Sequence, residues 1–172
     1  NQSNVSIEMI EEEYTFRINE YGFVPDSAGA GKFRGGLALV REYQALIDGT
    51  VLNVRSDKRD YPPHGLFGGK EGKPSKNILN PGSTDRLLPV LMTEVEMMKK
   101  GDVFRHTMAG GGGYGIPFDR DPERVLKDVI EEKVSLNAAK IEYGVVIIKS
   151  DRGTIVDKKA TIDLRRSIST GI

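Results

Sequence analysis

The sequence has no cysteine, no excess of either charge and no long apolar run, and each absence excludes a class of protein. Without cysteine the chain has no disulfide framework, no thiolate zinc site and no cysteine nucleophile. Its 25 Lys and Arg residues balance its 25 Asp and Glu residues, so no global field attracts it to nucleic acid or to an anionic membrane. No apolar stretch is long enough to span a membrane, and the N-terminus has no signal-peptide pattern. We therefore expect a cytoplasmic protein that binds neither nucleic acid nor membrane.

Glycine is abundant and unevenly placed. Seventeen of the 20 glycines fall between Gly22 and Gly115 of the 172 residues, which separates a turn-rich first part from a helix-compatible remainder. We predict an α+β fold with a β-rich body and long glycine-rich loops, followed by short C-terminal helices. The expected division is a β-rich part at 1–118 and a mainly helical part at 119–172, packed as one unit with it. The chain begins with Asn1 rather than Met, so we expect a piece of a longer protein.

The β-rich part opens with a strand. Residues 13–19 alternate apolar and polar side chains, which predicts a strand with Tyr14, Phe16 and Ile18 on one face. Residues 21–36 hold a proline and five glycines and predict an ordered loop.

Further strands are predicted from turn signals. Apolar runs at 37–47 and 51–55 flank Asp48-Gly49, a dipeptide that favours a β-hairpin between them. Two short strands are expected within 87–98 and 102–107.

Residues 56–89 form a long segment that is dense in Gly, Pro, Lys and Asp. A loop of that length is usually functional, interfacial or disordered. Its apolar side chains argue against disorder, so we expect the loop to pack against something. Those side chains are Tyr61, Leu66, Phe67, Ile78 and Leu79.

The C-terminal part carries helix signals. Asp121 followed by proline predicts an N-cap, with Val125, Leu126, Val129 and Ile130 on one face of the helix.

A second cap at Ser135 begins a helix that runs through Tyr143 and ends at Gly144 in a left-handed conformation. A strand at 145–148, a turn at 151–153 and a last helix capped by Asp157, with Ile162 and Leu164 on it, complete the prediction.

The run Gly110–Gly113 is the most unusual stretch. Four consecutive glycines imply backbone conformations or close approaches that a Cβ would forbid. The neighbour could be another strand, the phosphate or carboxylate of a ligand, or a partner subunit. A crowded structural crossing is the favoured interpretation, and an anion-binding cradle of N–H groups is the alternative.

The residues alone assign no catalytic set. His64 and His106 lie far apart, and neither has a second ligand at helical metal-binding spacing, so ordinary structural roles are favoured. Asp57, Asp60 and His64 could converge if their loop folds back. We therefore predict no metal site built from this chain alone.

A second glycine loop, 29–32, has some features of a phosphate loop. It lacks the required glycine five residues before Gly31 and the Ser or Thr after Lys32. Two interpretations stay open: Lys32, Arg34 and Arg41 bind an anion, or Arg34 pairs with Asp26.

Five blocks of sequence, in a fixed order, carry a resemblance to a known family. They are Glu20-Tyr-Gly-Phe-Val-Pro-Asp-Ser-Ala-Gly-Ala-Gly-Lys-Phe-Arg-Gly-Gly-Leu37, Pro62-Pro-His-Gly-Leu-Phe-Gly-Gly-Lys70, Asn77-Ile-Leu-Asn-Pro-Gly82, Lys100-Gly-Asp102 and Gly110-Gly-Gly-Gly-Tyr-Gly115. Together they resemble the C-terminal portion of the hydantoinase B family, which includes N-methylhydantoinase B subunits and the B half of 5-oxoprolinases. Ala28 and Ile116 depart from the family pattern, where glycine and an acidic residue are common.

The resemblance implies part of a cytoplasmic ATP-dependent hydrolase of cyclic amides. An A-type ATPase subunit would bind ATP and Mg²⁺ and phosphorylate the lactam oxygen, and the B part would complete ring opening. The metal-site residues of the B part would lie in an N-terminal portion absent from this sequence. The isolated chain is therefore expected to be inactive and to need both the rest of the B polypeptide and the A-type subunit.

Nine residues are the candidate substrate or interface positions under this resemblance. They are Asp26, Lys32, Arg34, His64, Gly110, Gly111, Gly112, Gly113 and Tyr114. An assembly module of the same complex, or of a related acetone or acetophenone carboxylase, is the alternative.

Overall fold

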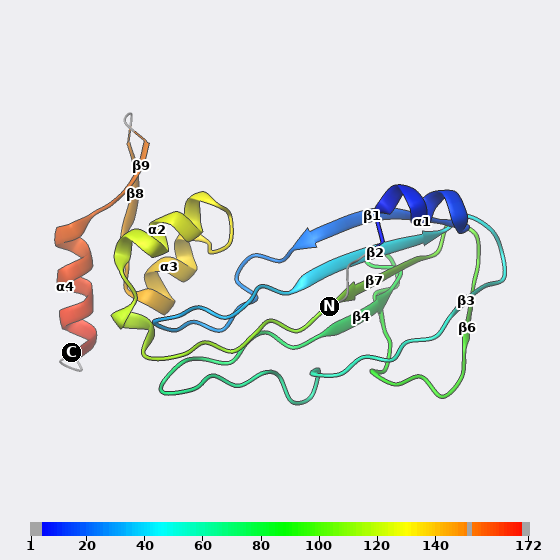
Figure 1. The fold of residues 1–172 in the computed structure, drawn as a ribbon, viewed down its shortest axis with the longest axis horizontal. Helices are drawn as coiled ribbons and strands as arrows, with labels where there is room; N and C mark the ends of the chain where they lie inside the picture. The colour runs from blue at the N-terminus through cyan, green and yellow to red at the C-terminus, as the bar shows by residue number, and fades with distance from the viewer. Residues whose placement is uncertain (1–4, 151–152, 170–172) are drawn as a thin grey trace. The chain divides into compact units, whose positions relative to one another are not determined.

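The computed structural model describes residues 5–150 and 153–169, coloured from blue to red along the chain in Figure 1. It combines antiparallel strands with helices, which confirms the predicted α+β class. In chain order the elements are α1 (Ile7–Glu13), β1 (Phe16–Phe23), β2 (Leu39–Ala45), β3 (Thr50–Leu52), β4 (Lys76–Leu79), β5 (Arg86–Leu87), β6 (Glu96–Met98), β7 (Val103–Thr107), the 3₁₀ helix η1 (Pro117–Asp119), α2 (Pro122–Ile130), α3 (Leu136–Tyr143), β8 (Ile147–Ser150), β9 (Gly153–Val156) and α4 (Lys158–Ser169).

The chain divides into two compact units that interleave along the sequence. Unit 1 holds the described residues up to Gly22 together with 39–61 and 74–108. Unit 2 holds 23–38, 62–73 and the described residues from Ala109 onward. The glycine-rich loops are thus grouped in one unit with the C-terminal helices. The reason is that these loops make their backbone hydrogen bonds with one another.

Unit 1 is built on a five-stranded sheet of order β1-β2-β7-β4-β5. Its central strand β7 is antiparallel to both β2 and β4, so that Phe104 lies opposite Tyr43 on one side and Leu79 on the other. Phe104 and Leu79 are buried. They belong to a core cluster with Ala45, Val54, Leu88 and Met98. The predicted long loop at 56–89 therefore contains two strands, and Leu79 packs into this core.

The predicted hairpin around Asp48-Gly49 is wrong. β2 pairs with β1 and β7, whereas β3 pairs with β6 in a separate two-stranded sheet. The dipeptide does form a turn, in which Gly49 has φ +78°. The Gly49 N–H donates to Met98 and the Asp48 carboxylate accepts from the Lys100 N–H. Hydrogen bonds to residues 98 and 100 therefore hold the turn. The strands on either side of it pair with β7 and β6 and not with each other.

Two other strand predictions needed correction. The strand expected within 87–98 is confined to β6 and the end of β5. The N-terminal strand begins at Phe16, because residues 7–13 form α1 with Ser6 as its N-cap. Phe16 is half-buried as the alternation predicts, but Tyr14 caps the helix and is exposed.

The predicted caps of unit 2 are confirmed. The Asp121 side chain accepts from the Glu123 N–H at the start of α2, and the Ser135 hydroxyl accepts from Ala138 at the start of α3. Gly144 ends α3 at φ +61°, and Asp157 caps α4. Most of the turn predicted at 151–153 lies outside the described residues.

The core of unit 2 lies among α2, α3 and the β8–β9 hairpin. It contains Ala30, Val125, Val134, Ala139, Tyr143 and Val145. Ile130, expected on the apolar face of α2, is exposed. Within the described part of the chain no helix is both long and apolar enough to cross a membrane.

Candidate functional site

Three extended segments of unit 2 lie against one another and form what we call the glycine bundle: residues 27–36, 63–73 and 110–115. Gly29 donates its N–H to Gly111, at 2.8 Å, which joins the first segment to the third. Lys70 donates to Ala30 at 2.7 Å and accepts from Gly113 at 2.9 Å, which joins the second segment to both others. Backbone hydrogen bonds therefore join each of the three segments to the other two.

The bundle is packed so closely that side chains have no room at its contacts. A Cβ at Gly110 would lie 1.9 Å from the Ser27 carbonyl oxygen, and one at Gly112 would lie 2.1 Å from that of His64. A Cβ at Gly113 would lie 2.2 Å from the Ala30 carbonyl oxygen. The close approach predicted from the glycine run is thus present, and the neighbour is the chain's own backbone.

The N–H groups of the glycine run are used inside the unit. Gly110 donates to Lys73 and Gly111 to Gly36, at 2.9 and 2.8 Å, and Gly113 donates to Lys70. Three of the four N–H groups that an anion-binding cradle would need are therefore already bonded.

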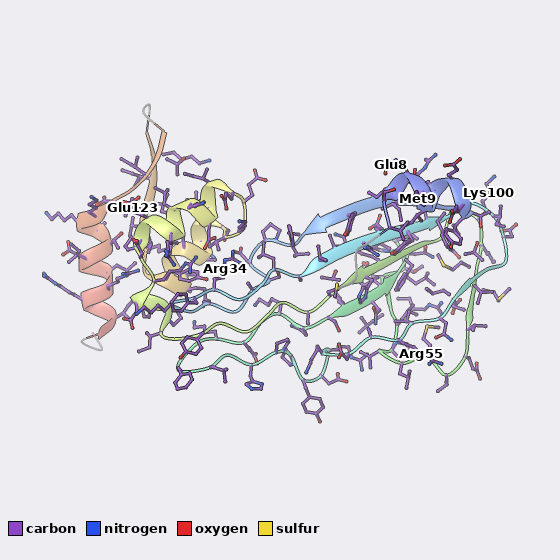
Figure 2. All side chains as sticks on the ribbon, in the orientation of Figure 1. Glu8, Met9, Arg34, Arg55, Lys100 and Glu123 are labelled. Atoms are coloured by element: carbon purple, nitrogen blue, oxygen red, sulfur yellow. The ribbon has the colours of Figure 1, made fainter. Side chains whose placement is uncertain are left out.

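A buried charge cluster fastens the bundle to α2. The Asp128 carboxylate accepts from Arg34 Nε at 3.2 Å and Nη2 at 3.3 Å, and from Arg120 Nη2 at 2.8 Å. All three side chains are at most 15% exposed. Figure 2 labels Arg34, which lies beside the helices. The remaining bonds of the two guanidinium groups hold the bundle, because Arg34 Nη1 donates to Gly35 and Arg120 Nη1 to Lys32.

The alternative that Arg34 pairs with Asp26 is wrong. Asp26 instead accepts the backbone N–H of Ser135 at 2.8 Å, beside the start of α3. Its backbone is left-handed, with φ +57°. Aspartate tolerates that conformation better than most residues. Asp26 directly precedes the first segment of the bundle and connects it to the start of α3, as Arg34 connects the bundle to α2.

A cavity of about 310 Å³ opens between the bundle and α3. Asp26, Arg34 and Tyr143 line it, and so do several charged side chains of both signs: Lys70, Glu71, Lys73, Lys133 and Glu142. Lys70 and Glu142 form an ion pair of 2.6 Å across it. The cavity has the size and charge to hold a small polar group.

Tyr143 is the buried titratable group of this cavity. It is 2% exposed, and burial raises its pKa to about 12. The raised pKa extends the range in which the phenol stays neutral well into alkaline pH.

The raised pKa of Tyr143 predicts a loss of stability in strong alkali. A raised pKa in the folded state means that stability is fully present below the unfolded value near 10 and falls as the pH rises through 12. The free energy of unfolding should fall by up to about 1.4 kcal/mol per pH unit in that window. Urea titrations from pH 9 to 12 measure this fall, and Tyr143→Phe should make it shallower. An unchanged slope in the variant would contradict the assignment.

The side chains of three other predicted residues belong to the glycine bundle but do not line the cavity. Lys32 and the side chain of His64 are exposed, and Tyr114 is 47% exposed. The structure thus brings Asp26 and Arg34 to one cavity and leaves these three outside it.

Within residues 5–150 and 153–169 no group of three His, Asp or Glu side chains is placed to hold a metal. Asp57, Asp60 and His64 therefore do not form such a group, and Asp60 pairs with its neighbour Arg59. His106 belongs to unit 1, where its Nδ1 lies 2.7 Å from Asn77 Oδ1. Burial and then the charge of Arg41 lower the pKa of His106. The residues present therefore do not fit the metal that the resemblance places in the B part.

Sequence reasoning missed Asp128 and Arg120. Arg120 precedes α2 and Asp128 lies within it. Charged residues at such positions are usually exposed, and no local sequence signal marks either one as buried. Asp128 meets Arg34 across 94 residues of sequence, so only the tertiary structure reveals the pair.

Comparisons with known proteins agree with this architecture. The model of the family described as hydantoinase B/oxoprolinase matches residues 1–117. The B component of a putative D-/L-hydantoinase from a Pseudomonas species is 33% identical over 168 residues, which are 96% of this chain and 28% of that protein. An uncharacterised protein of Methanocaldococcus jannaschii is 37% identical over 163 residues, covering 94% of this chain and 28% of its own length.

A solved structure extends the likeness to the fold. The crystal structure of the ATP-dependent caprolactamase from Pseudomonas jessenii superposes with a TM-score of 0.77 at 30% identity, covering 94% of this chain and 28% of that one. The chain thus spans little more than a quarter of the length of these three relatives. From its sequence and its fold, the chain belongs to the hydantoinase B/oxoprolinase family.

Proposed function

We propose that this chain is the C-terminal region of the B-type polypeptide of an ATP-dependent hydrolase that opens cyclic amides. The observation that carries the proposal is the match of 94% of the chain, in sequence and in fold, to a caprolactamase described as ATP-dependent. The substrate class is a lactam, a hydantoin or 5-oxoproline.

The chemistry of the class explains why ATP is needed. An amide is a poor electrophile, and transfer of the γ-phosphoryl group to its oxygen gives an imidate that water attacks readily. Proton transfer to the nitrogen lets the carbon–nitrogen bond break, which leaves an acyl phosphate. A second water hydrolyses the acyl phosphate to the ring-opened carboxylate and inorganic phosphate. We propose that an A-type ATPase subunit binds the ATP and Mg²⁺ and that the complex is cytoplasmic. This chain would be part of the complex but would not carry a full catalytic set.

The contacts of the candidate residues favour a structural role for this region. Asp26 and Arg34 are both engaged in hydrogen bonds within unit 2, and three N–H groups of the glycine run are bonded internally. The cavity beside them offers charged groups but has no histidine among its lining residues. A rigid scaffold that positions the rest of the B-type polypeptide fits these observations.

The test compares the isolated chain with the complete complex. With ATP and caprolactam, a hydantoin or 5-oxoproline, the complex should release the ring-opened product together with phosphate, and the isolated chain should release none. Ring opening by the isolated chain would contradict the incomplete catalytic set. A complex that consumes bicarbonate with ATP, and leaves cyclic amides intact, would place the protein with the carboxylases instead.

A further inference from the structure

Five apolar side chains form a cluster on the surface of unit 2, which we call the aromatic platform: Phe33, Leu66, Phe67, Tyr114 and Ile116. The Tyr114 ring lies at its centre, 6.2 Å from the ring of Phe33 and 5.0 Å from that of Phe67. The Ile116 side chain packs over Gly68, the residue after Phe67. A Cβ at Gly68 would lie 3.2 Å from Cγ1 of Ile116. The platform thus draws on all three segments of the glycine bundle.

The backbone beneath the platform is fixed. Phe33 and Tyr114 exchange two hydrogen bonds of 2.9 Å, and Leu66 donates to Gly113 and accepts from Gly115 at the same distance. The platform is therefore preorganised, which lowers the conformational entropy lost when a partner binds.

The platform remains open to solvent. Its five side chains are between 47% and 76% exposed, and Phe67 is the most exposed of them. Single apolar side chains on a surface are ordinary, whereas a contiguous aromatic group marks an interaction site. Tyrosine and phenylalanine of this kind are also the typical anchors of protein interfaces.

The backbone of Phe67 gives a second, independent indication. Phe67 has φ +51°, a conformation that is uncommon for a bulky side chain and costs on the order of 1–3 kcal/mol. Within unit 2 this ring gains little burial to offset that cost, since 76% of the residue is exposed. Backbone strain at Phe67 that no burial within unit 2 offsets indicates that the ring makes its contact with another part of the protein.

The relatives indicate which surface covers the platform. In the Pseudomonas hydantoinase component and in the caprolactamase, the matched region is 28% of a longer chain. The remainder of such a chain is attached to this fold and is present at high effective concentration. We propose that the aromatic platform is the docking surface for the remaining part of the B-type polypeptide, which inserts apolar side chains around Phe67 and Tyr114. This proposal rests on the proposed function, because it takes the chain to be part of such a polypeptide.

Site-specific crosslinking in the complete complex tests the platform. Phe67 is replaced by the photoreactive p-benzoylphenylalanine, a change that keeps the aromatic ring, and the crosslinked peptides are identified by mass spectrometry. The matched control places the same amino acid at Phe23, which belongs to the same unit, is 66% exposed and lies outside the platform. Crosslinks to the remaining part of the B-type polypeptide should be about tenfold more abundant from position 67, since a covered anchor touches protein and an exposed ring touches water.

Two other outcomes would overturn the proposal. Crosslinks from position 67 that reach only the A-type subunit would assign the platform to a different partner, and equal yields from positions 67 and 23 would show that nothing covers it. Turnover of a cyclic amide with ATP, measured on the same preparation, separates the two ideas. Turnover without the expected crosslink rejects the docking surface alone, and the crosslink without turnover rejects the proposed function alone.

Discussion

Gly35→Ala should unfold unit 2, while the neighbouring change Gly36→Ala should leave it intact. A Cβ at Gly35 would lie 2.0 Å from the carbonyl oxygen of Gly111 and 2.8 Å from that of Gly112. Both neighbours are backbone atoms. Gly111 is itself held by hydrogen bonds to Gly29 and Gly36, so it cannot move aside without breaking them. We expect a loss of about 3 kcal/mol or more in the free energy of unfolding.

Gly36 makes a closely matched control. It is the next residue in the same segment, its φ is not positive, and a Cβ there would meet no atom within 4 Å. Alanine at such a position reduces the entropy of the unfolded chain, so Gly36→Ala should be neutral or stabilising by up to about 1 kcal/mol. Urea denaturation followed by circular dichroism measures both variants. Equal midpoints for the two would show that the segments of the bundle are not packed as described.

Asp128→Ala should destabilise unit 2 by about 3–5 kcal/mol, because it leaves two guanidinium groups buried without their carboxylate. Arg34 and Arg120 both depend on Asp128, and each is at most 15% exposed. The Nε atom of Arg120 already has no partner among the described residues, so the cluster has no spare acceptor. The loss should appear as a lower midpoint of unfolding.

The control for this variant is Glu131→Ala, which lies about one turn further along the chain at the end of α2. Glu131 forms ion pairs with Lys127 and Lys133 at the surface. Exposed pairs of this kind contribute little to stability, because water and salt screen them. The midpoint of unfolding should therefore hardly change. An effect of Glu131→Ala as large as that of Asp128→Ala would mean that net charge, and not the buried cluster, decides stability.

The caps of α2, α3 and α4 were predictable from sequence because they depend on neighbouring residues only, whereas α1 was not predicted. Asp121, Ser135 and Asp157 each bond an N–H group two or three residues ahead, and Gly144 adopts the left-handed conformation within its own turn. Caps of this kind depend only on residues within four positions of one another in the sequence.

The strand pairing was not predictable in the same way. Asp48-Gly49 makes the turn that its sequence predicts, yet the strands on either side pair with β7 and β6, far along the chain. A dipeptide specifies a local reversal of the chain. Which strands then share hydrogen bonds depends on the apolar faces that the whole unit can bury.

The candidate site shows the same division. The glycine-run sequence requires a close neighbour, and the structure identifies it as the carbonyl groups of Ser27, His64 and Ala30. The aromatic rings are plain in the sequence, but residues 33, 67 and 114 become one surface only when the three segments meet.

By itself, the sequence determined the α+β class, the caps of α2, α3 and α4, the close backbone approach at the glycine run, and the family through its ordered blocks. Only the tertiary structure decided that Arg34 meets Asp128, that the glycine loops belong with the helices, and that an aromatic surface lies open beside them. The physical reason is range: caps and turns are fixed by bonds between near neighbours, whereas buried ion pairs and packed backbones depend on segments that folding brings together from distant parts of the chain.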